Sequence, residues 1–172
     1  MTRKEKISFK TIVRHLTLSD LENSIASALG EKPKSISSRI ASIEQIMQPS
    51  LKELFFTPNA IFVEGAEDMA FLFTYLDLLD LVSEFRSYQC HFITVGGKTN
   101  MSRPLAVAKA FSINTFAIFD GDNDALKNED IEKNRRDYSC LLNLIGLKGF
   151  DPLSRNIIWG DNVVMWPTNI RD

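Results

Sequence analysis

The chain has 172 residues, a length that fits one ordinary domain or one domain with a small appendage. Apolar residues make up 44% of the sequence and charged residues 24%, a globular mixture that excludes a disordered tail, a collagen-like repeat and a disulfide scaffold. The formal net charge of −2 excludes both a global basic field for nucleic acid and an acidic tail for a basic partner.

Cysteine usage and hydropathy indicate the cellular compartment in which the protein is expected. Cys90 and Cys140 fit neither a CxxC motif nor a zinc-site spacing, so we expect two free thiols in a reducing environment. No apolar segment of secretory type follows the basic N-terminus, and the most apolar stretch, residues 69–82, is shorter than the ~20 residues of a membrane span. We therefore expect a cytoplasmic protein without a membrane partner.

The first 56 residues have a helical pattern. Ser19 and Glu22 form a capping-box pattern at the start of a helix that Gly30 ends. Apolar residues at helical spacing predict a second helix over 35–47. Because these helices are too few to bury a core of their own, we expect residues 1–56 to dock on the domain that follows or on a second copy of the chain.

Residues 57–172 alternate between short apolar runs and helical patterns, and we assign them to one domain. Strands that are apolar on both faces and are separated by helices are typical of a parallel sheet covered by helices, so the predicted fold class is α/β. The predicted strands cover 60–64, 91–95, 115–119, 156–159 and 163–166, and the predicted helices cover 67–82, 102–111 and 129–144.

Each of the first three predicted strands is followed by chemically unusual residues. The first leads into Glu64 and Gly65, the second into Gly-Gly-Lys-Thr-Asn at residues 96–100, and the third into Asp-Gly-Asp-Asn-Asp at residues 120–124. Ligands of such sheets bind beyond the carboxyl ends of the strands. We therefore expect these three segments to share one rim of the sheet.

The acidic residues of this rim predict a metal site. Asp120 and Asp122 lie two residues apart, so their side chains point the same way in an extended segment, and Gly121 lets the backbone turn sharply. Crowded carboxylates raise one another's pKa unless a cation neutralises them, and all-oxygen ligation suits one or two Mg²⁺ or Mn²⁺ ions. The candidate ligands are Glu64, Asp68, Asp120, Asp122 and Asp124.

Simpler interpretations of the same residues stay open. An aspartate at a strand end is often a turn former or helix cap, and Asp68 fits the first turn of a helix. Ala125 and Ile131 occupy positions where an EF-hand needs Gly and Glu, so a calcium loop is excluded. Residues 96–99 lack the Walker A spacing, and they form either a plain strand-to-helix turn or a loop that meets a phosphate through its N–H groups or through Lys98.

The three motifs in this order resemble the TOPRIM domain of topoisomerases, primases and related nucleases. Within that group the chain is most similar to endonucleases of the overcoming lysogenization defect (OLD) family, over residues 55–166, with Phe55 and Phe56 ahead of the first strand. The resemblance implies a Rossmann-like, mostly parallel sheet flanked by helices, behind an N-terminal helical segment. It also implies a metal-dependent DNA endonuclease.

The resemblance assigns roles to individual residues. Glu64 and Asp68 belong to its glutamate motif and Asp120 and Asp122 to its Asp-x-Asp motif, with Asp124 adding to a second metal position. We expect Glu64, Asp120, Asp122 and Lys98 to act in catalysis, and the residues that meet DNA phosphates to be Gly97, Lys98, Arg135 and Arg136.

Further expectations concern partners. Family members carry an ATPase domain before this region, and no Walker A motif occurs here, so we expect an ATPase domain or subunit outside the chain. A homodimer and a setting in phage defence or DNA repair are implied by the family alone. OLD-like nucleases also use a basic residue beyond the TOPRIM fold, for which the nearby candidates are Lys98, Arg135, Arg136, Lys148 and Arg155.

Two rival functions remain at this point. A non-catalytic TOPRIM-like module would bind metal or DNA, or dock an ATPase, without cutting. A phosphatase of the haloacid-dehalogenase type would use Phe119-Asp120-Gly121-Asp122, but that class needs Thr or Val where this chain has Asp124.

Overall fold

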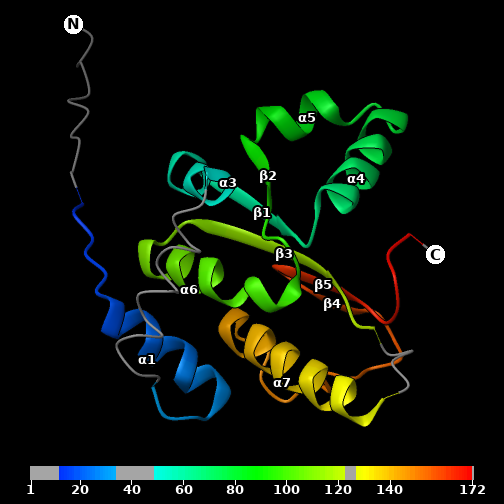
Figure 1. Ribbon diagram of the computed structural model, residues 1–172. Helices are drawn as coiled ribbons and strands as arrows, with labels where there is room; N and C mark the ends of the chain where they lie inside the picture. The colour runs from blue at the N-terminus through cyan, green and yellow to red at the C-terminus, as the bar shows by residue number, and fades with distance from the viewer. Residues whose placement is uncertain (1–11, 34–48, 123–126, 172) are drawn as a thin grey trace, which may run out of the picture.

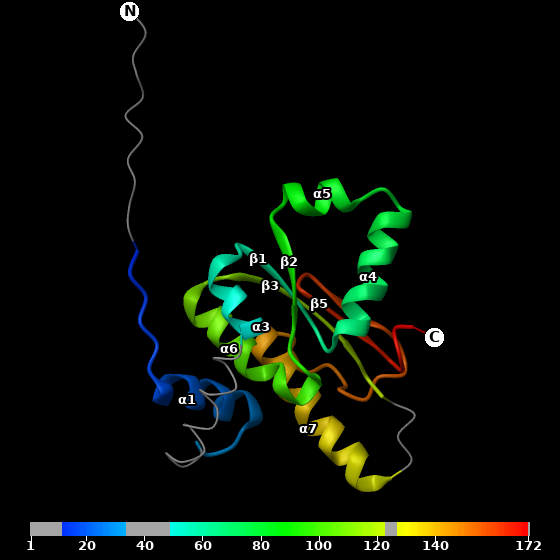
Figure 2. The same ribbon diagram turned by 45° about the horizontal axis from the view of Figure 1, so that its top comes forward.

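The computed structural model describes residues 12–33, 49–122 and 127–171. A five-stranded sheet lies at its centre, with α6 and α7 over one face and α4 over the other (Figures 1 and 2). The helical segments are α1 (Leu18–Leu29), α3 (Pro49–Lys52), η1 (Glu53–Phe56), α4 (Ala66–Leu78), α5 (Val82–Ser87), η2 (Lys98–Asn100), α6 (Ser102–Phe111) and α7 (Asn128–Ile145).

The sheet confirms the predicted α/β class. Its strand order is β2-β1-β3-β5-β4, and β1 pairs in parallel with both β2 and β3, as β3 does with β5. The short β4 pairs antiparallel with β5, so the sheet is mostly parallel. The strands are β1 (Asn59–Val63), β2 (Cys90–Thr94), β3 (Asn114–Asp120), β4 (Ile158–Gly160) and β5 (Val163–Trp166).

The core lies between the sheet and the α6–α7 layer. Phe62 pairs in register with Ile93 and Ala117, and all three side chains are buried on this face. On the opposite face Ile61 pairs in register with Phe92 and Phe116, and these side chains are only half-buried. The helix α4 that covers this second face has no buried residue. The two faces of the sheet are therefore unequally closed.

The first helix begins two residues earlier than its sequence pattern predicted. The capping box consists of Thr17 and Asp20, with the Asp20 N–H donating to the Thr17 hydroxyl, so the prediction of Ser19 and Glu22 was wrong. Glu22 is buried instead of capping the helix end. The end of the helix at Gly30, in the left-handed conformation with φ 70°, is confirmed. The helix predicted over 35–47 lies outside the described residues.

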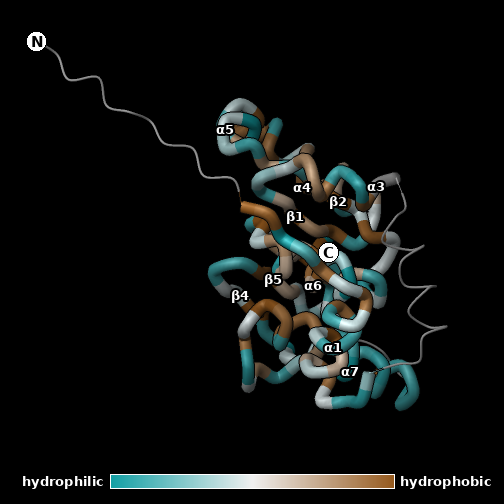
Figure 3. Tube along the Cα trace, turned by 90° about the vertical axis from the view of Figure 1, so that its left-hand side faces the viewer, coloured by the Kyte–Doolittle hydropathy of each residue, from teal (hydrophilic) through white to brown (hydrophobic). Residues whose placement is uncertain are grey.

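Helix α1 packs against α7 and α6 (Figure 1). The Asn143 side-chain amide donates to the Ala28 carbonyl at 2.8 Å, and Arg136 pairs with Glu31. Polar and apolar residues alternate along both helices (Figure 3), as expected of amphipathic helices that bury one side. The boundary at residue 56 stays a prediction, although α1 itself rests on the α/β layer.

The single helix predicted over 67–82 is two helices. Asp80 adopts a left-handed backbone with φ 57°, which separates α4 from α5. A non-glycine residue in this conformation breaks the i→i−4 ladder, and apolar periodicity alone does not reveal such a break. In the described part of the chain, no helix has both the length and the apolar composition required to cross a membrane. Cys90 and Cys140 are free thiols.

The α6–α7 face should carry most of the fold's stability. Phe119 is buried and stacks on Tyr138 with ring centroids 5.7 Å apart, so Phe119→Ala should lower the free energy of unfolding by about 3–5 kcal/mol. Phe56→Ala removes the same atoms from a side chain that is 88% exposed, so it should change the free energy of unfolding by less than about 1 kcal/mol. Urea denaturation followed by circular dichroism measures both, and equal losses would contradict this description of the core.

Candidate functional site

The carboxyl ends of β1, β2 and β3 meet at one edge of the sheet, as the sequence predicted. Glu64 follows β1, the loop with Lys98 follows β2, and Asp120 is the last residue of β3. Parallel pairing places these three positions side by side. We call this edge, with Glu64, Asp68, Lys98, Asp120 and Asp122, the acidic rim.

Glu64 connects the three strand ends. One carboxylate oxygen accepts the Asp120 backbone N–H at 2.9 Å, and the other accepts the Lys98 backbone N–H at 3.2 Å. Burial raises the pKa of the Glu64 carboxyl, and the charge of Asp120 acts in the same direction, while these hydrogen bonds and the Lys98 ammonium oppose the rise. Glu64 is therefore a part-buried acid whose ionised form a nearby positive charge would stabilise.

The loop after β2 turns on two glycines. Gly96 and Gly97 have φ of 71° and 109°, in the region that favours glycine. This turn lets the Gly97 N–H donate to the Glu64 carbonyl at 2.8 Å and points the next N–H, that of Lys98, at the Glu64 carboxylate. Both N–H groups are thus engaged by Glu64, which leaves the Lys98 side chain as the part of this loop that can meet a phosphate.

The Lys98 side chain lies along the rim between two partners. Its ammonium donates to the Tyr138 hydroxyl at 2.6 Å and pairs with the Asp122 carboxylate. Burial lowers the pKa of Lys98, and the nearby charges of Glu64 and Asp120 oppose that shift. Lys98 therefore places a positive charge among the acids.

Tyr138 is a residue of this site that the sequence reasoning missed. It is 0% exposed, and it lies on α7 beside Leu141 and Leu142. Because a buried tyrosine usually finds a partner for its hydroxyl, its position on the apolar stripe of α7 was the available signal. No local sequence pattern predicts that Lys98 is the partner of this hydroxyl.

Asp120 and Asp122 contact different partners. Asp120 accepts the Ile170 backbone N–H at 2.9 Å, whereas Asp122 pairs with Lys98. The sharp turn falls on Asp122 itself, with φ 41°, and not on Gly121 as expected. Burial raises the pKa of the Asp120 carboxyl and the charge of Asp68 adds to the rise, while the Ile170 hydrogen bond, Arg171 and Lys98 oppose it.

Asp68 caps the start of α4, one of the two roles that the sequence left open, and its role as a metal ligand stays a prediction. One oxygen accepts the Gly65 N–H at 3.0 Å in the capping box of α4, and the side chain is only 14% exposed. The other oxygen lies 3.8 Å from Nε of Arg171, which also pairs with Glu67. Arg171 was not among the predicted basic candidates, because only the tertiary fold brings residues after β5 to this rim.

Arg135 and Arg136 lie in surface ion pairs on α7. Arg136 makes two hydrogen bonds to Glu31, at 2.8 and 2.9 Å, and Arg135 lies 3.8 Å from Glu132. The structure records neither in contact with the rim carboxylates. Their contact with DNA stays a prediction, and Asp124 lies outside the described residues.

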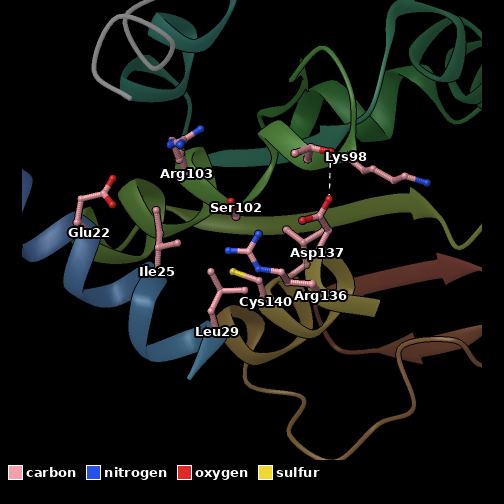
Figure 4. Close-up of a pocket in the computed structure, with 11 residues that line it drawn as sticks. Glu22, Ile25, Leu29, Lys98, Ser102, Arg103, Arg136, Asp137 and Cys140 are labelled. Atoms are coloured by element: carbon pink, nitrogen blue, oxygen red, sulfur yellow. Dashed lines mark hydrogen bonds between the residues drawn. The ribbon is translucent and has the colours of Figure 1, made fainter. Parts of the chain in front are cut away.

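A small cavity of about 110 Å³ lies between α1, α6 and α7 (Figure 4). Lys98 lines one end, but its side chain points away from the other lining residues (Figure 4). The Thr99 hydroxyl donates to Asp137 at 3.1 Å across that end, the contact drawn as a dashed line. The cavity therefore lies behind the Lys98 loop, and the rim carboxylates do not line it.

Comparison with known families agrees with this arrangement. Residues 55–122 match the family model of the overcoming lysogenization defect protein-like TOPRIM domain. Over this segment the chain is similar to an OLD-like TOPRIM domain. The match covers β1 to β3 and includes Glu64, Lys98, Asp120 and Asp122. Searches of curated proteins and of solved structures found no significant match.

TOPRIM domains bind divalent metal ions, and the donor atoms of the acidic rim suit such an ion in kind. They are carboxylate oxygens, which Mg²⁺ and Mn²⁺ prefer, and Glu64 and Asp120 are acids whose pKa is raised by burial. Within residues 12–33, 49–122 and 127–171, however, no three acidic, histidine or cysteine side chains are grouped closely enough to hold an ion. Lys98 and Arg171 contact Asp122 and Asp68 instead.

The charge of Asp120 should be unfavourable to the metal-free TOPRIM domain at neutral pH. Because the folded-state pKa is above the unfolded-state value, ionising this carboxyl lowers stability above the folded pKa, and the loss disappears below the unfolded pKa. Asp120→Asn keeps the acceptor for Ile170 and removes the charge, so in EDTA it should raise the free energy of unfolding at pH 7.

Urea denaturation at pH 7 and at pH 4 measures this effect, and the gain should shrink at the lower pH. Asp161→Asn, an exposed position in the turn between β4 and β5, is the matched control and should show no such pH-dependent gain. A gain for Asp120→Asn that is absent at pH 7, or equal at both pH values, would contradict this description of the rim.

Proposed function

We propose that this chain is a divalent metal-dependent DNA endonuclease, or the catalytic TOPRIM part of one, which hydrolyses phosphodiester bonds. The observation that carries the proposal is the convergence of part-buried acids at the ends of β1 and β3, next to Lys98. Asp120 feels the charges of Asp68 and Lys98, and Glu64 those of Asp120 and Lys98, so these groups lie close to one another. Such crowding favours a divalent cation as the partner.

The proposed ligands are Glu64, Asp68, Asp120 and Asp122, with Asp124 as a further candidate, for one or two Mg²⁺ or Mn²⁺ ions. Such an ion, when bound, supplies Lewis-acid chemistry: it lowers the pKa of an attacking water and neutralises charge on the phosphodiester. We assign Lys98 to the phosphate, because it is the rim cation that a buried residue, Tyr138, holds in place. Lys98 would then offset phosphate charge while Glu64 keeps the strand ends together.

The wider setting follows from the same proposal. DNA would lie across the rim, with Arg135 and Arg136 as further candidate phosphate contacts, whereas the Gly97 N–H is already engaged by the Glu64 carbonyl. A homodimer, an ATPase domain or subunit outside the chain, a cytoplasmic location and a role in phage defence remain parts of the proposal. The cytoplasmic location is suggested by cysteine usage and hydropathy and the other three by the OLD-like family, and each needs its own experiment.

A second candidate function is a non-catalytic module that binds metal or DNA or docks an ATPase. The observation that favours it is the pairing of Lys98 with Asp122 and of Arg171 with Asp68 and Glu67, together with the lack of an assembled three-acid group in the described residues. This candidate predicts metal uptake without strand cleavage.

Nicking of supercoiled plasmid DNA with Mn²⁺ distinguishes the two functions. We expect wild type to nick, and Glu64→Ala and Asp120→Ala to lose at least about 100-fold, since even residues that only support metal ligands change affinity or activity by 10–100-fold. Asp161→Ala is the control: its turn precedes β5, at the opposite edge of the sheet from Asp120, and its activity should be unchanged.

Circular dichroism shows whether each variant has folded. Equal nicking by wild type and by both rim variants would place the activity outside this site. Mn²⁺ binding by wild type without any nicking would favour the non-catalytic module.

A further inference from the structure

One short segment after β5 contacts two of the proposed metal ligands at once. Ile170 donates its backbone N–H to Asp120 at 2.9 Å, and Nε of Arg171 lies 3.8 Å from Asp68. The Arg171 guanidinium also pairs with Glu67, the neighbour of Asp68 on α4. We call residues 167–171 the latch.

The sheet itself brings the latch to the rim. In the parallel pairing of β3 with β5, Asp120 stands opposite Trp166, and the Trp166 carbonyl accepts the Gly121 N–H at 2.6 Å. The chain that leaves β5 therefore emerges beside Asp120 and passes near the start of α4 (Figures 1 and 2). The contacts with Asp120 and Asp68 follow from this exit.

Asn169 holds the arginine of the latch in position. Its side-chain oxygen accepts the Arg171 backbone N–H at 2.9 Å and the Arg171 Nε–H at 3.1 Å. These two bonds turn the guanidinium towards the acids on α4. The contact is nevertheless weak, because the Arg171 side chain is 39% exposed and its distance to Asp68 is long for a hydrogen bond.

We propose that the latch competes with divalent cations for Asp120 and Asp68, so that metal loading displaces Arg171 and releases Ile170 from Asp120. This inference rests on the proposed metal site. The guanidinium supplies one positive charge to the same acids that a divalent ion would neutralise, and both cannot occupy the same side of Asp68. The Arg171 guanidinium thus occupies this side of Asp68 until a metal ion binds.

Titration calorimetry with Mn²⁺ on the full chain tests the competition. Arg171→Gln should bind Mn²⁺ roughly two- to fivefold more tightly than wild type, the range that loss of one exposed ion pair supports. Arg171→Lys keeps the charge without the planar fork and should fall between the two. The control is Arg86→Gln, which removes the same charge from an exposed position on α5. This position lies near the start of β2, at the opposite end of the strands from the rim, so the Mn²⁺ affinity of this variant should equal that of wild type.

A fluorescence titration reports the latch directly. The chain has 2 tryptophans, and Trp159→Phe leaves Trp166, which precedes the latch, as the sole reporter. Mg²⁺ should change Trp166 emission over the concentrations at which it binds, and the change should be smaller when Arg171→Gln is added. The Gln variant must first show the circular dichroism spectrum of wild type; if it does not, the Lys variant carries the comparison.

The outcomes separate the two proposals. Mn²⁺ uptake by wild type with unchanged or weaker affinity in Arg171→Gln overturns the latch and leaves the metal site standing. A lack of Mn²⁺ uptake by wild type and by Arg171→Gln alike overturns both. Tighter binding by Arg171→Gln together with the smaller Trp166 signal supports the latch.

Discussion

Crowded negative charge at the carboxyl edge of a parallel sheet is the constraint on which this site depends. Glu64 and Asp120 are part-buried, so each loses hydration, and each lies close enough to another acid for its pKa to be raised further. Backbone N–H groups supply part of the compensation at Glu64. The remainder comes from cations, which in the structure are the side chains of Lys98 and Arg171.

The fold builds this edge with few residues. Parallel pairing aligns the strand ends, and the left-handed Gly96 and Gly97 direct the next loop back to Glu64. Tyr138 crosses from α7 to hold the Lys98 ammonium while its ring stacks on Phe119. The site is thus anchored to the well-packed core between the sheet and the α6–α7 layer, so the side chains that would meet a ligand project from a rigid support.

The opposite face has a different character. Helix α4 covers it without burying any of its own residues, and the latch reaches the rim from the same direction through Glu67 and Asp68. Contacts of exposed side chains are individually weak and exchange easily with solvent ions. The molecule therefore combines a firm attachment at Glu64 and Lys98 with a loosely held cation at Arg171. This division suits a site that must bind and release a charged ligand.

The sequence by itself determined the element types and the places where strands end. The spacing of apolar residues predicts α6, and short apolar runs predict the strands. The three motifs after β1, β2 and β3 place Glu64, Lys98 and Asp120 on one rim, because parallel strands all end at the same edge. These signals are local, and so they are readable residue by residue. The sequence did not predict the left-handed conformations of Asp80 and Asp122, because a single residue with positive φ does not change the spacing of apolar residues.

Only the tertiary structure decided which cation meets which acid. The partners Lys98 and Tyr138, Arg136 and Glu31, and Arg171 and Asp68 are far apart in the chain, and no spacing rule connects them. Their pairing depends on how α1 and α7 pack and on where the chain leaves β5. An ion pair is specified by distance after folding, whereas a helix or a strand is specified by neighbours along the chain, and for that reason the acids were predictable and their counterions were not.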